Sequence, residues 1–361
     1  MNMLLLICFI PVIIAVFFAI RYFWSKKKGL EDISKDINEF LIDEDKPDKQ
    51  TSIENFLTDF KYAYSLIFKE KEIIFFSLMQ WVAIGAAYYL WTLVLGWIPE
   101  DVWKAVADKR EYDKIYNILF VIWSFLCVGF AAAFIGVFSA CIGAVNFLAR
   151  QNRESTIPVC LKIVLNNIIN IWLFHWIDGW ITVRTILERL PSKRKSHIPM
   201  IVREALYYAW KLGTIGMLPG LIIGYSLPRA ARNSIGFVKQ KLARTAGLRV
   251  GYSTLCWIIG ILAYVVAFFF MAYFGPKGEV NTIIQVFYIY AGVPILAATG
   301  IVVLFLRPVY IIVSCNIYSD YLEENRRKIT LNENPVRLHL LVIFVVLFAA
   351  AMATVSYLAN L

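Results

Sequence analysis

Long apolar runs dominate the chain and recur six times. The hydrocarbon core of a bilayer is about 30 Å thick and a helix rises about 1.5 Å per residue, so a span needs about 20 mostly apolar residues. Six stretches meet this requirement, at approximately residues 3–22, 73–97, 115–148, 251–274, 282–313 and 338–360. The pattern predicts an all-α, polytopic membrane protein with about six transmembrane helices.

The segments around these runs predict four parts. Polar, acidic residues without a sustained apolar period predict a linker, and the apolar runs predict helices. The expected parts are an N-terminal signal-anchor helix, an acidic cytoplasmic linker, a multi-helix membrane domain and a C-terminal transmembrane helix, at residues 1–28, 29–52, 53–336 and 337–361.

Composition and charge support this picture. The chain is 60% hydrophobic and 17% charged, whereas soluble proteins are about half apolar and a quarter charged. With the first run placed N-terminus outside, alternation puts 31 of the 36 Lys and Arg residues on the cytoplasmic side. Because cytoplasmic loops carry excess Lys and Arg, this distribution predicts a multi-pass membrane protein with both termini outside. Low His and abundant Lys, Ile and Asn favour a bacterial source, so the expected location is the bacterial inner membrane.

Residues 150–250 form a basic block with 16 Lys or Arg and four acidic residues. Two apolar pieces lie inside it, residues 163–183 and residues 205–227, and both contain charged or amide side chains. Either the pieces cross the bilayer, or they form re-entrant or interfacial amphipathic helices. The second interpretation is favoured because polar groups at membrane depth need protein or water partners.

The first apolar piece contains the polar residues Asn170, His175 and Asp178. His175 and Asp178 are three residues apart, so on a helix they share a face and are placed to form a hydrogen bond. Ionisable residues inside a membrane often mark an ion or proton path, which makes the three residues a possible intramembrane polar site. Alternatively, the helix lies at the headgroup level with its polar edge toward water.

The second piece contains glycines at four-residue spacing. Gly216, Gly220 and Gly224 form a small-xxx-small pattern that lets helix backbones approach closely, and Pro219 interrupts it. Close helix packing or a kink is the expected role, and a gating hinge is the alternative.

Residues 229–249 predict a basic amphipathic helix. Ile235, Val238 and Leu242 share one stripe of it, and no acidic residue occurs in the segment. Such a helix binds anionic lipid headgroups or a protein partner. Alternatively, its positive charge only sets the orientation of the chain in the membrane. Nucleic-acid binding is disfavoured because a stacking platform of aromatic residues is missing. The predicted headgroup or partner contacts are Arg229, Arg232, Lys239, Lys241, Arg244 and Arg249.

Candidate chemistry for an enzyme is sparse. The six cysteines are scattered without a C-x-x-C pair, and three histidines are too dispersed for a zinc site. Nucleotide loops, nucleophile elbows and metalloprotease motifs do not occur in the sequence. No catalytic residue, metal or cofactor is therefore predicted.

Four stretches, together with the apolar hairpin after residue 152, resemble a bacterial multi-pass membrane family of unknown function. They are FKYAYSLIFKEKEIIFF, VFSACIGAVNFLARQN, AWKLGTIGMLPGLIIGYSLPRAARNSIGFVKQKLARTAG and RPVYIIVSCNIYSDYLEE, at residues 60–76, 137–152, 209–247 and 307–324. Trp210, Thr214, Pro219 and Ser234 occupy the positions of the family's Trp-x-x-x-Thr, Pro and Ser pattern. The resemblance covers about residues 55–325 and implies a topology without an activity. The N-terminal anchor, the linker and the last span are additional to that pattern.

The function expected from these features is that of a non-enzymatic integral membrane protein. The basic block favours a scaffold or lipid-interacting subunit of a membrane complex, held against the anionic inner leaflet. The alternative is a transporter or channel in which residues 163–183 and 205–227 form broken helices around a polar site.

Overall fold

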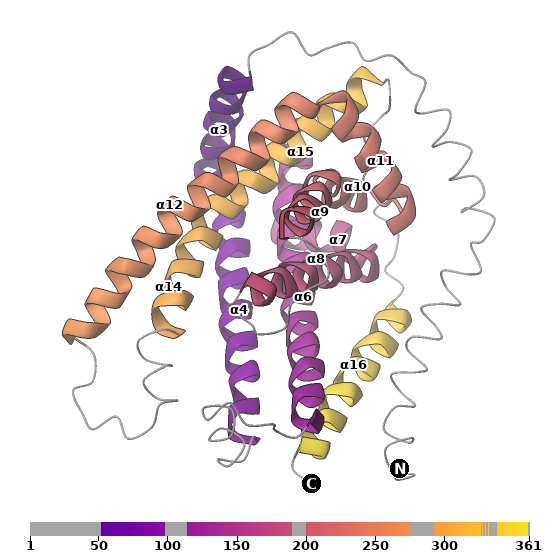
Figure 1. Ribbon diagram of the computed structural model, residues 1–361. Coiled ribbons are helices and arrows are strands. Elements are labelled where there is room, and N and C mark those ends of the chain that lie inside the picture. The colour runs from indigo at the N-terminus through magenta and orange to yellow at the C-terminus, as the bar shows by residue number, and fades with distance from the viewer. Residues whose placement is uncertain are drawn as a thin grey trace. The chain divides into compact units, whose positions relative to one another are not determined.

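The computed structural model describes residues 52–97, 114–189, 200–274, 292–325, 327, 329, 331 and 338–359. Within these residues the regular structure is entirely helical (Figure 1). The elements are α3 (Ser52–Lys69), α4 (Lys71–Trp97), α6 (Lys114–Arg150), α7 (Ile157–Leu165), α8 (Ile168–Arg189), α9 (Met200–Gly213), α10 (Met217–Ile222), α11 (Leu227–Gln240), α12 (Leu242–Phe274), α14 (Val293–Ile301), η2 (Val302–Leu306), α15 (Arg307–Glu324) and α16 (Leu338–Ala359). The predicted anchor and, except for Ser52, the linker lie outside the described residues.

Four of the described helical segments are long and apolar enough to cross a bilayer. They are Lys71–Thr92, Val121–Arg150, Leu242–Phe274 and Val293–Glu324. These correspond to four of the six predicted spans, so the chain is a multi-pass membrane protein by the length and composition of its helices. The predicted span at residues 3–22 lies outside the described residues, and the last predicted span contains the shorter apolar helix Leu341–Tyr357.

The helices belong to two compact units, and the division passes through α4 and α6. The described part of the first unit comprises residues 86–97, 114–132 and 338–359. Within it, the indole of Trp91 donates to Ser124 Oγ at 3.0 Å and the indole of Trp123 donates to the Leu90 carbonyl at 3.1 Å. Both indoles therefore join this part of α4 to the neighbouring part of α6.

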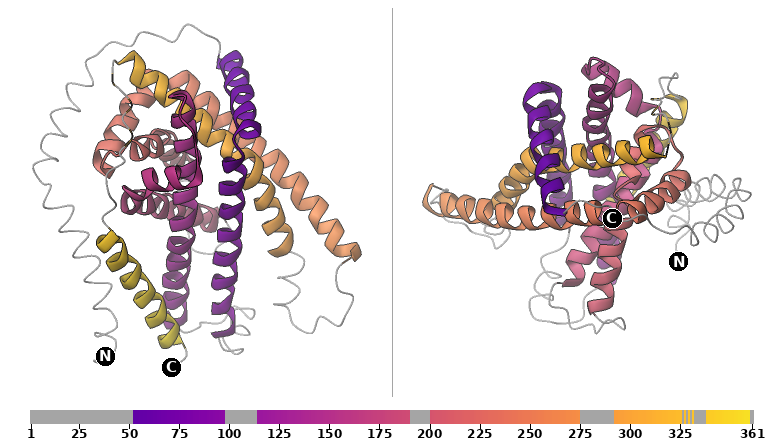
Figure 2. Two further views of the ribbon diagram at one scale, coloured as in Figure 1. Left: turned by 180° about the vertical axis from the view of Figure 1, so that it is seen from behind. Right: turned by 90° about the horizontal axis from the view of Figure 1, so that it is seen from above.

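The second unit, which comprises residues 46–85 and 133–334, contains the main core. Its centre is α15, where Ile312, Cys315 and Tyr318 are completely buried. Seen from both sides, α15 runs beside the first half of α12 (Figures 1 and 2). Helix α3 packs against the same pair and buries Ala63, Leu66 and Ile67, while Phe68 on this helix is 77% exposed.

A sharp bend separates α7 from α8. The two helices meet at an angle of 81°, and the break falls at Asn166 and Asn167. The Asn167 amide donates to the carbonyls of Leu221 and Tyr225 at 2.9 and 2.8 Å, which connects the corner to α10 and the turn after it. The predicted apolar piece at 163–183 is therefore not one straight helix. It is a bent pair whose second helix, α8, runs beside α9 (Figure 2).

The second apolar piece is divided into short helices rather than one interrupted span. α9 ends at Gly213, α10 occupies only Met217–Ile222, and Gly224 turns the chain toward α11 with a φ of 101° that favours glycine. The predicted amphipathic helix at 229–249 is likewise broken, because α11 ends at Gln240 and α12 starts at Leu242.

A π-helical turn connects α14 to α15. Across η2 the N–H of Arg307 donates to the carbonyl of Val302, five residues earlier. Such a turn accommodates one more residue than an α-helical turn and changes the direction in which the following side chains point. Arg307 is the first residue after it, and Pro308, which lacks an N–H, follows.

Candidate functional site

The polar residues predicted on α8 lie in the second unit, where their side chains have different partners. Asp178 accepts hydrogen bonds from Lys211 Nζ at 2.6 Å and from the Trp210 indole at 3.0 Å, both from α9. His175 instead donates from Nδ1 to the Ile171 carbonyl at 3.0 Å. Asn170 donates to Asn167 at the helix corner. Asp178 therefore joins α8 to α9, whereas Asn170 supports the bend.

His175 is buried against α6 because that helix carries a glycine at the contact. A Cβ at Gly136 would lie 3.1 Å from His175 Nδ1, which leaves little room for any other residue. One turn along α6, Ser139 accepts hydrogen bonds from Arg307 Nε and Nη2 at 3.3 and 3.1 Å. The contact of Arg307 with α6 was not predicted from the sequence.

Three cations gather around this position from three helices. We refer to Lys211 of α9, Arg249 of α12 and Arg307 of α15 as the basic cluster. Lys211 is close enough to the two arginines for their charges to act on it. Asp178 is the carboxylate that accompanies them among the described residues. With His175 neutral, three positive charges and one negative charge leave an excess of two.

Lys211 shows the effect of this environment on a charged group. Its side chain is 12% exposed, and burial lowers the pKa of its ammonium group, with the charges of Arg249 and Arg307 adding to the effect. The Asp178 carboxylate acts in the opposite direction, because its charge and its hydrogen bond stabilise the protonated form of Lys211. Lys211 and Asp178 therefore form an ion pair that is exposed to the positive charges of Arg249 and Arg307.

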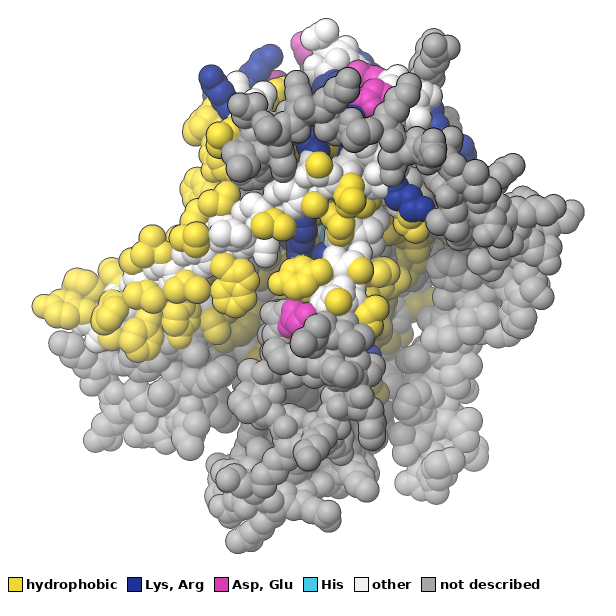
Figure 3. All heavy atoms as spheres, turned by 45° about the horizontal axis from the view of Figure 1, so that its top comes forward, with side chains coloured by type: hydrophobic (Ala, Val, Ile, Leu, Met, Phe, Trp, Pro, Cys, Tyr) yellow, Lys and Arg dark blue, Asp and Glu magenta, His cyan; other side chains and the backbone are white. Residues whose placement is uncertain are grey.

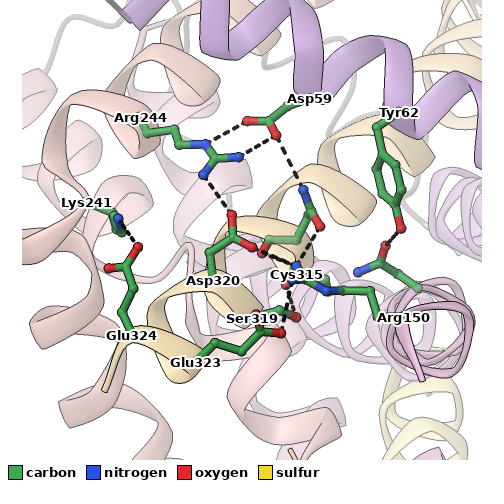
Figure 4. Close-up of polar contacts among 12 residues, drawn as sticks. Asp59, Tyr62, Arg150, Lys241, Arg244, Cys315, Ser319, Asp320, Glu323 and Glu324 are labelled. Carbon is green, nitrogen blue, oxygen red and sulfur yellow. Dashed lines mark hydrogen bonds and ion pairs between the residues drawn. The ribbon is translucent and has the colours of Figure 1, made fainter. Parts of the chain in front are cut away.

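In a second group of charged residues, every cation is paired with a carboxylate of the chain (Figure 4). Arg244 of α12 binds Asp59 of α3 through two hydrogen bonds of 2.8 and 2.5 Å, and binds Asp320 of α15 at 2.8 Å. Arg150, at the end of α6, reaches Asp320 at 2.8 Å and Glu323 at 3.0 Å. We refer to these residues together with Lys241 and Glu324 as the ion-pair cluster.

The ion-pair cluster connects four helices that are far apart in the sequence. Asp320 lies between two arginines, and Asp59 is only 3% exposed, so this part is largely shielded from water. Beside it, Tyr62 donates to Asn146 Oδ1 at 3.2 Å, and burial raises the pKa of Tyr62, which keeps this donor protonated. The cluster therefore joins α3, α6, α12 and α15 into one framework.

The six cations predicted to contact headgroups or partners are in different environments. Lys241 pairs with Glu324 at 2.8 Å and Arg244 belongs to the ion-pair cluster, so both bind within the chain. Arg249 belongs to the basic cluster. Arg229 lies over the ring of Tyr225 at 4.8 Å and is exposed, as is Lys239. Only part of the predicted set therefore lies on an outer surface.

The outer face of α11 combines charge and apolar groups. Arg229, Arg232 and Lys239 lie at helical spacing with Ile235, which is 52% exposed. Val238, which was predicted to share a stripe with Ile235, is only 8% exposed and faces the core. The face that remains outside is therefore basic with an apolar centre, which is typical of a helix lying among lipid headgroups.

The glycine pattern has a packing role at one position in particular. A Cβ at Gly216 would lie 2.7 Å from Phe237 and 3.2 Å from the Ser234 backbone, so α11 approaches this point closely. Ser234 Oγ accepts from the Gly216 N–H at 3.0 Å and donates to the Gly213 carbonyl at 2.6 Å. Gly220 and Pro219 are also buried, in α10. The observed contacts support packing, and the hinge stays a hypothesis.

The acidic half of the ion-pair cluster was not predicted from the sequence. Asp59 and Asp320 were not among the predicted site residues, and their partners are 185 and 76 residues away from them. An acidic residue on the buried face of an amphipathic helix was the available signal, since such a residue needs a partner.

Comparison with protein-family models, with curated proteins and with solved structures finds no match. The resemblance to a bacterial membrane family therefore stays a prediction. Within the described ranges, no three His, Cys, Asp or Glu side chains come together as metal ligands would. The arrangement of charges is thus the feature from which a function is argued.

Proposed function

We propose that the protein is a non-enzymatic, lipid-interacting scaffold subunit of a bacterial inner-membrane complex, with its basic face in the cytoplasmic leaflet. The observation that carries this proposal is the position of the cations relative to α12. Arg249 lies near the start of α12, and Arg229 and Lys239 lie exposed on the helix before it, whereas no residue of the most apolar stretch of α12 is buried. Cations followed by exposed apolar surface fit the boundary between headgroups and acyl chains.

The outer face of α11 supports the same placement of the headgroup boundary, near the start of α12. Its exposed cations and Ile235 would lie among anionic headgroups, each cation contributing on the order of 1 kcal/mol near a charged leaflet. The ion-pair cluster serves as the rigid frame that keeps α11 and α12 at this level. Both termini would then lie outside, as the distribution of Lys and Arg implies.

Lipid analysis of the full-length protein tests the proposal. The protein is extracted with its surrounding lipid from membranes of mixed phosphatidylglycerol and phosphatidylcholine, and the enrichment of phosphatidylglycerol is measured. The wild type should be enriched, and Arg229→Gln with Lys239→Gln should lower the enrichment several-fold. Lys61→Gln, at an exposed position of α3, is the matched control. Equal enrichment in the double variant and the wild type would contradict the proposal.

A transporter or channel is the second candidate, and one observation favours it. The bent pair α7–α8 and the partly buried Asp178–Lys211 pair resemble the broken helices and charged groups of transporters. If this candidate is right, His175→Ala with Asp178→Ala should abolish a proton-dependent flux into proteoliposomes. A flux that persists in the double variant, or that is absent from the wild type, excludes it.

A further inference from the structure

A groove between α12 and α14 starts beside the basic cluster. Its volume is about 440 Å³, within the range of small-molecule sites. Arg249 and Tyr252 line the end nearest the start of α12, and the walls beyond them include Trp257, Ile261, Ala298 and Val302. The groove therefore has one cationic end and a long apolar remainder.

Arg249 has hydrogen-bonding capacity that the chain does not use. Its guanidinium group contacts Tyr310, and the rings of Tyr310 and Tyr252 pack with centroids 4.4 Å apart. The Nε of Arg249 is buried, and the described part of the chain offers it no acceptor. Among the described residues no carboxylate pairs with Arg249 either, so an anion that reaches its guanidinium group from the groove would compensate this charge.

The surroundings of Arg249 add attraction for an anion. The basic cluster holds three cations against Asp178, and Asp178 already bonds to Lys211 and Trp210. In Figure 3, Lys and Arg side chains lie among hydrophobic side chains near the middle of the face, beside the apolar arm at the left. The excess positive charge of the basic cluster and the apolar groove therefore lie next to each other in the second unit.

We propose that the groove binds one anionic membrane lipid, with a headgroup phosphate at Arg249 and an acyl chain along α12 and α14. This inference rests on the proposed function and specifies the lipid class and the site. A guanidinium group forms strong charge-assisted hydrogen bonds with phosphate oxygens. A free inorganic anion would leave the apolar walls unused, whereas a lipid fits both ends of the groove.

The site can be blocked sterically as well as electrostatically. Gly260 also lines the groove, and a Cβ at this position would meet only Val302, at 3.9 Å. Gly260→Leu should therefore place an apolar side chain in the space of the acyl chain without altering any charge. Arg249→Gln removes the charge and retains most of the shape. Two variants with unrelated changes then test the same site.

Native mass spectrometry of the full-length, delipidated protein in detergent provides the test. We expect the wild type to retain one phosphatidylglycerol in preference to phosphatidylcholine. Arg249→Gln should weaken this binding about tenfold or more, as for a lost charge-assisted hydrogen bond. Gly260→Leu should weaken it to a similar extent because its side chain fills the space of the acyl chain. Lys61→Gln, at an exposed position of α3, should bind as the wild type does. Inorganic phosphate should not displace the lipid.

Three results would overturn the inference. Wild-type binding by both groove variants would show that the lipid lies elsewhere. Equal retention of phosphatidylcholine would exclude selection by charge, and displacement by inorganic phosphate would identify a site for soluble anions. If one of these results occurs while the α11 double variant still loses its lipid enrichment, only the groove site fails. If the enrichment is unaffected by the α11 variant, the proposed function fails instead.

Discussion

The ion-pair cluster and the basic cluster contain the same kinds of residues and have opposite charge balances. In the first, three cations, Arg150, Lys241 and Arg244, meet four carboxylates, those of Asp59, Asp320, Glu323 and Glu324. In the second, three cations meet one carboxylate. The first group has a net charge of −1, and we call it balanced because each of its cations is paired with a carboxylate of the chain; these pairs fix helices relative to one another. The unbalanced group retains an attraction that only something outside the chain can satisfy.

Two arginines of α12 illustrate this difference most directly. Arg244 and Arg249 are five residues apart on one helix, yet Arg244 binds two aspartates while the Nε of Arg249 has no acceptor in the described part of the protein. The identity of the residue is therefore not informative here. What differs is whether α3 and α15 bring a carboxylate to the same level of the helix.

The largest expected effect comes from removing Asp59 from the balanced group. Asp59→Ala leaves Arg244 with one carboxylate in a largely buried position, and removing one partner of a buried ion pair typically costs several kcal/mol. We expect a loss of about 3 kcal/mol in the free energy of unfolding, measured as a lower midpoint of thermal unfolding in detergent. Lys61→Ala on the same helix should leave the midpoint unchanged.

A double-mutant cycle distinguishes the ion pair from a general effect of the α3 substitution. In an Arg244→Ala background, Asp59→Ala should be less destabilising than in the wild type, because the partner is already absent. Fully additive losses in stability would show that the two residues act independently and would remove the basis for the comparison.

An intermediate effect is expected when the unbalanced group loses its carboxylate. Asp178→Asn raises the excess in the basic cluster from two positive charges to three, and leaves Lys211 with a neutral partner. We expect a loss of about 2 kcal/mol in zwitterionic detergent. Added phosphatidylglycerol should reduce this loss, whereas it should not help Asp59→Ala. The same loss with and without the anionic lipid would argue against a shared lipid site.

The smallest effect is expected at the edge of the balanced group. Lys241 is buried, but its partner Glu324 is 47% exposed, and ion pairs open to water contribute about 0–1 kcal/mol. Lys241→Gln should therefore lower stability by less than about 1 kcal/mol, and added salt should diminish the difference. A loss as large as that of Asp59→Ala would mean that this ion pair is as well shielded from water as Asp59 is.

Hydrophobic runs predicted the helical class and four of the membrane-crossing segments, because a helix in lipid needs a fixed length of apolar sequence. Breaks inside polar or glycine-containing pieces were harder to predict. The bend at Asn167 depends on carbonyls of Leu221 and Tyr225, more than 50 residues away. The division between α11 and α12 at Lys241 has no local signal such as proline or glycine.

The candidate site could be predicted only in part. His175 and Asp178 were identified as unusual for lipid, but their partners were not, because Lys211, Gly136 and Arg307 come from other helices. Arg249 was identified as one of six equivalent cations. The structure assigns these cations to an ion-pair network, an outer face and a groove, a distinction that depends on tertiary contacts alone.

The π-helical turn before Arg307 makes the number of residues between α14 and α15 important, whichever residues they are. Each residue of an α-helix advances the side-chain direction by about 100°, so deleting any one residue of Val302–Leu306 would restore a regular helix and rotate what precedes it relative to Arg307. Hydropathy and charge along the chain would scarcely change. Arg307 could nevertheless no longer contact Ser139 while α14 keeps its present packing against α12. A single insertion or deletion in this turn would therefore change the orientation of α14 relative to Arg307 without changing the composition of the helix.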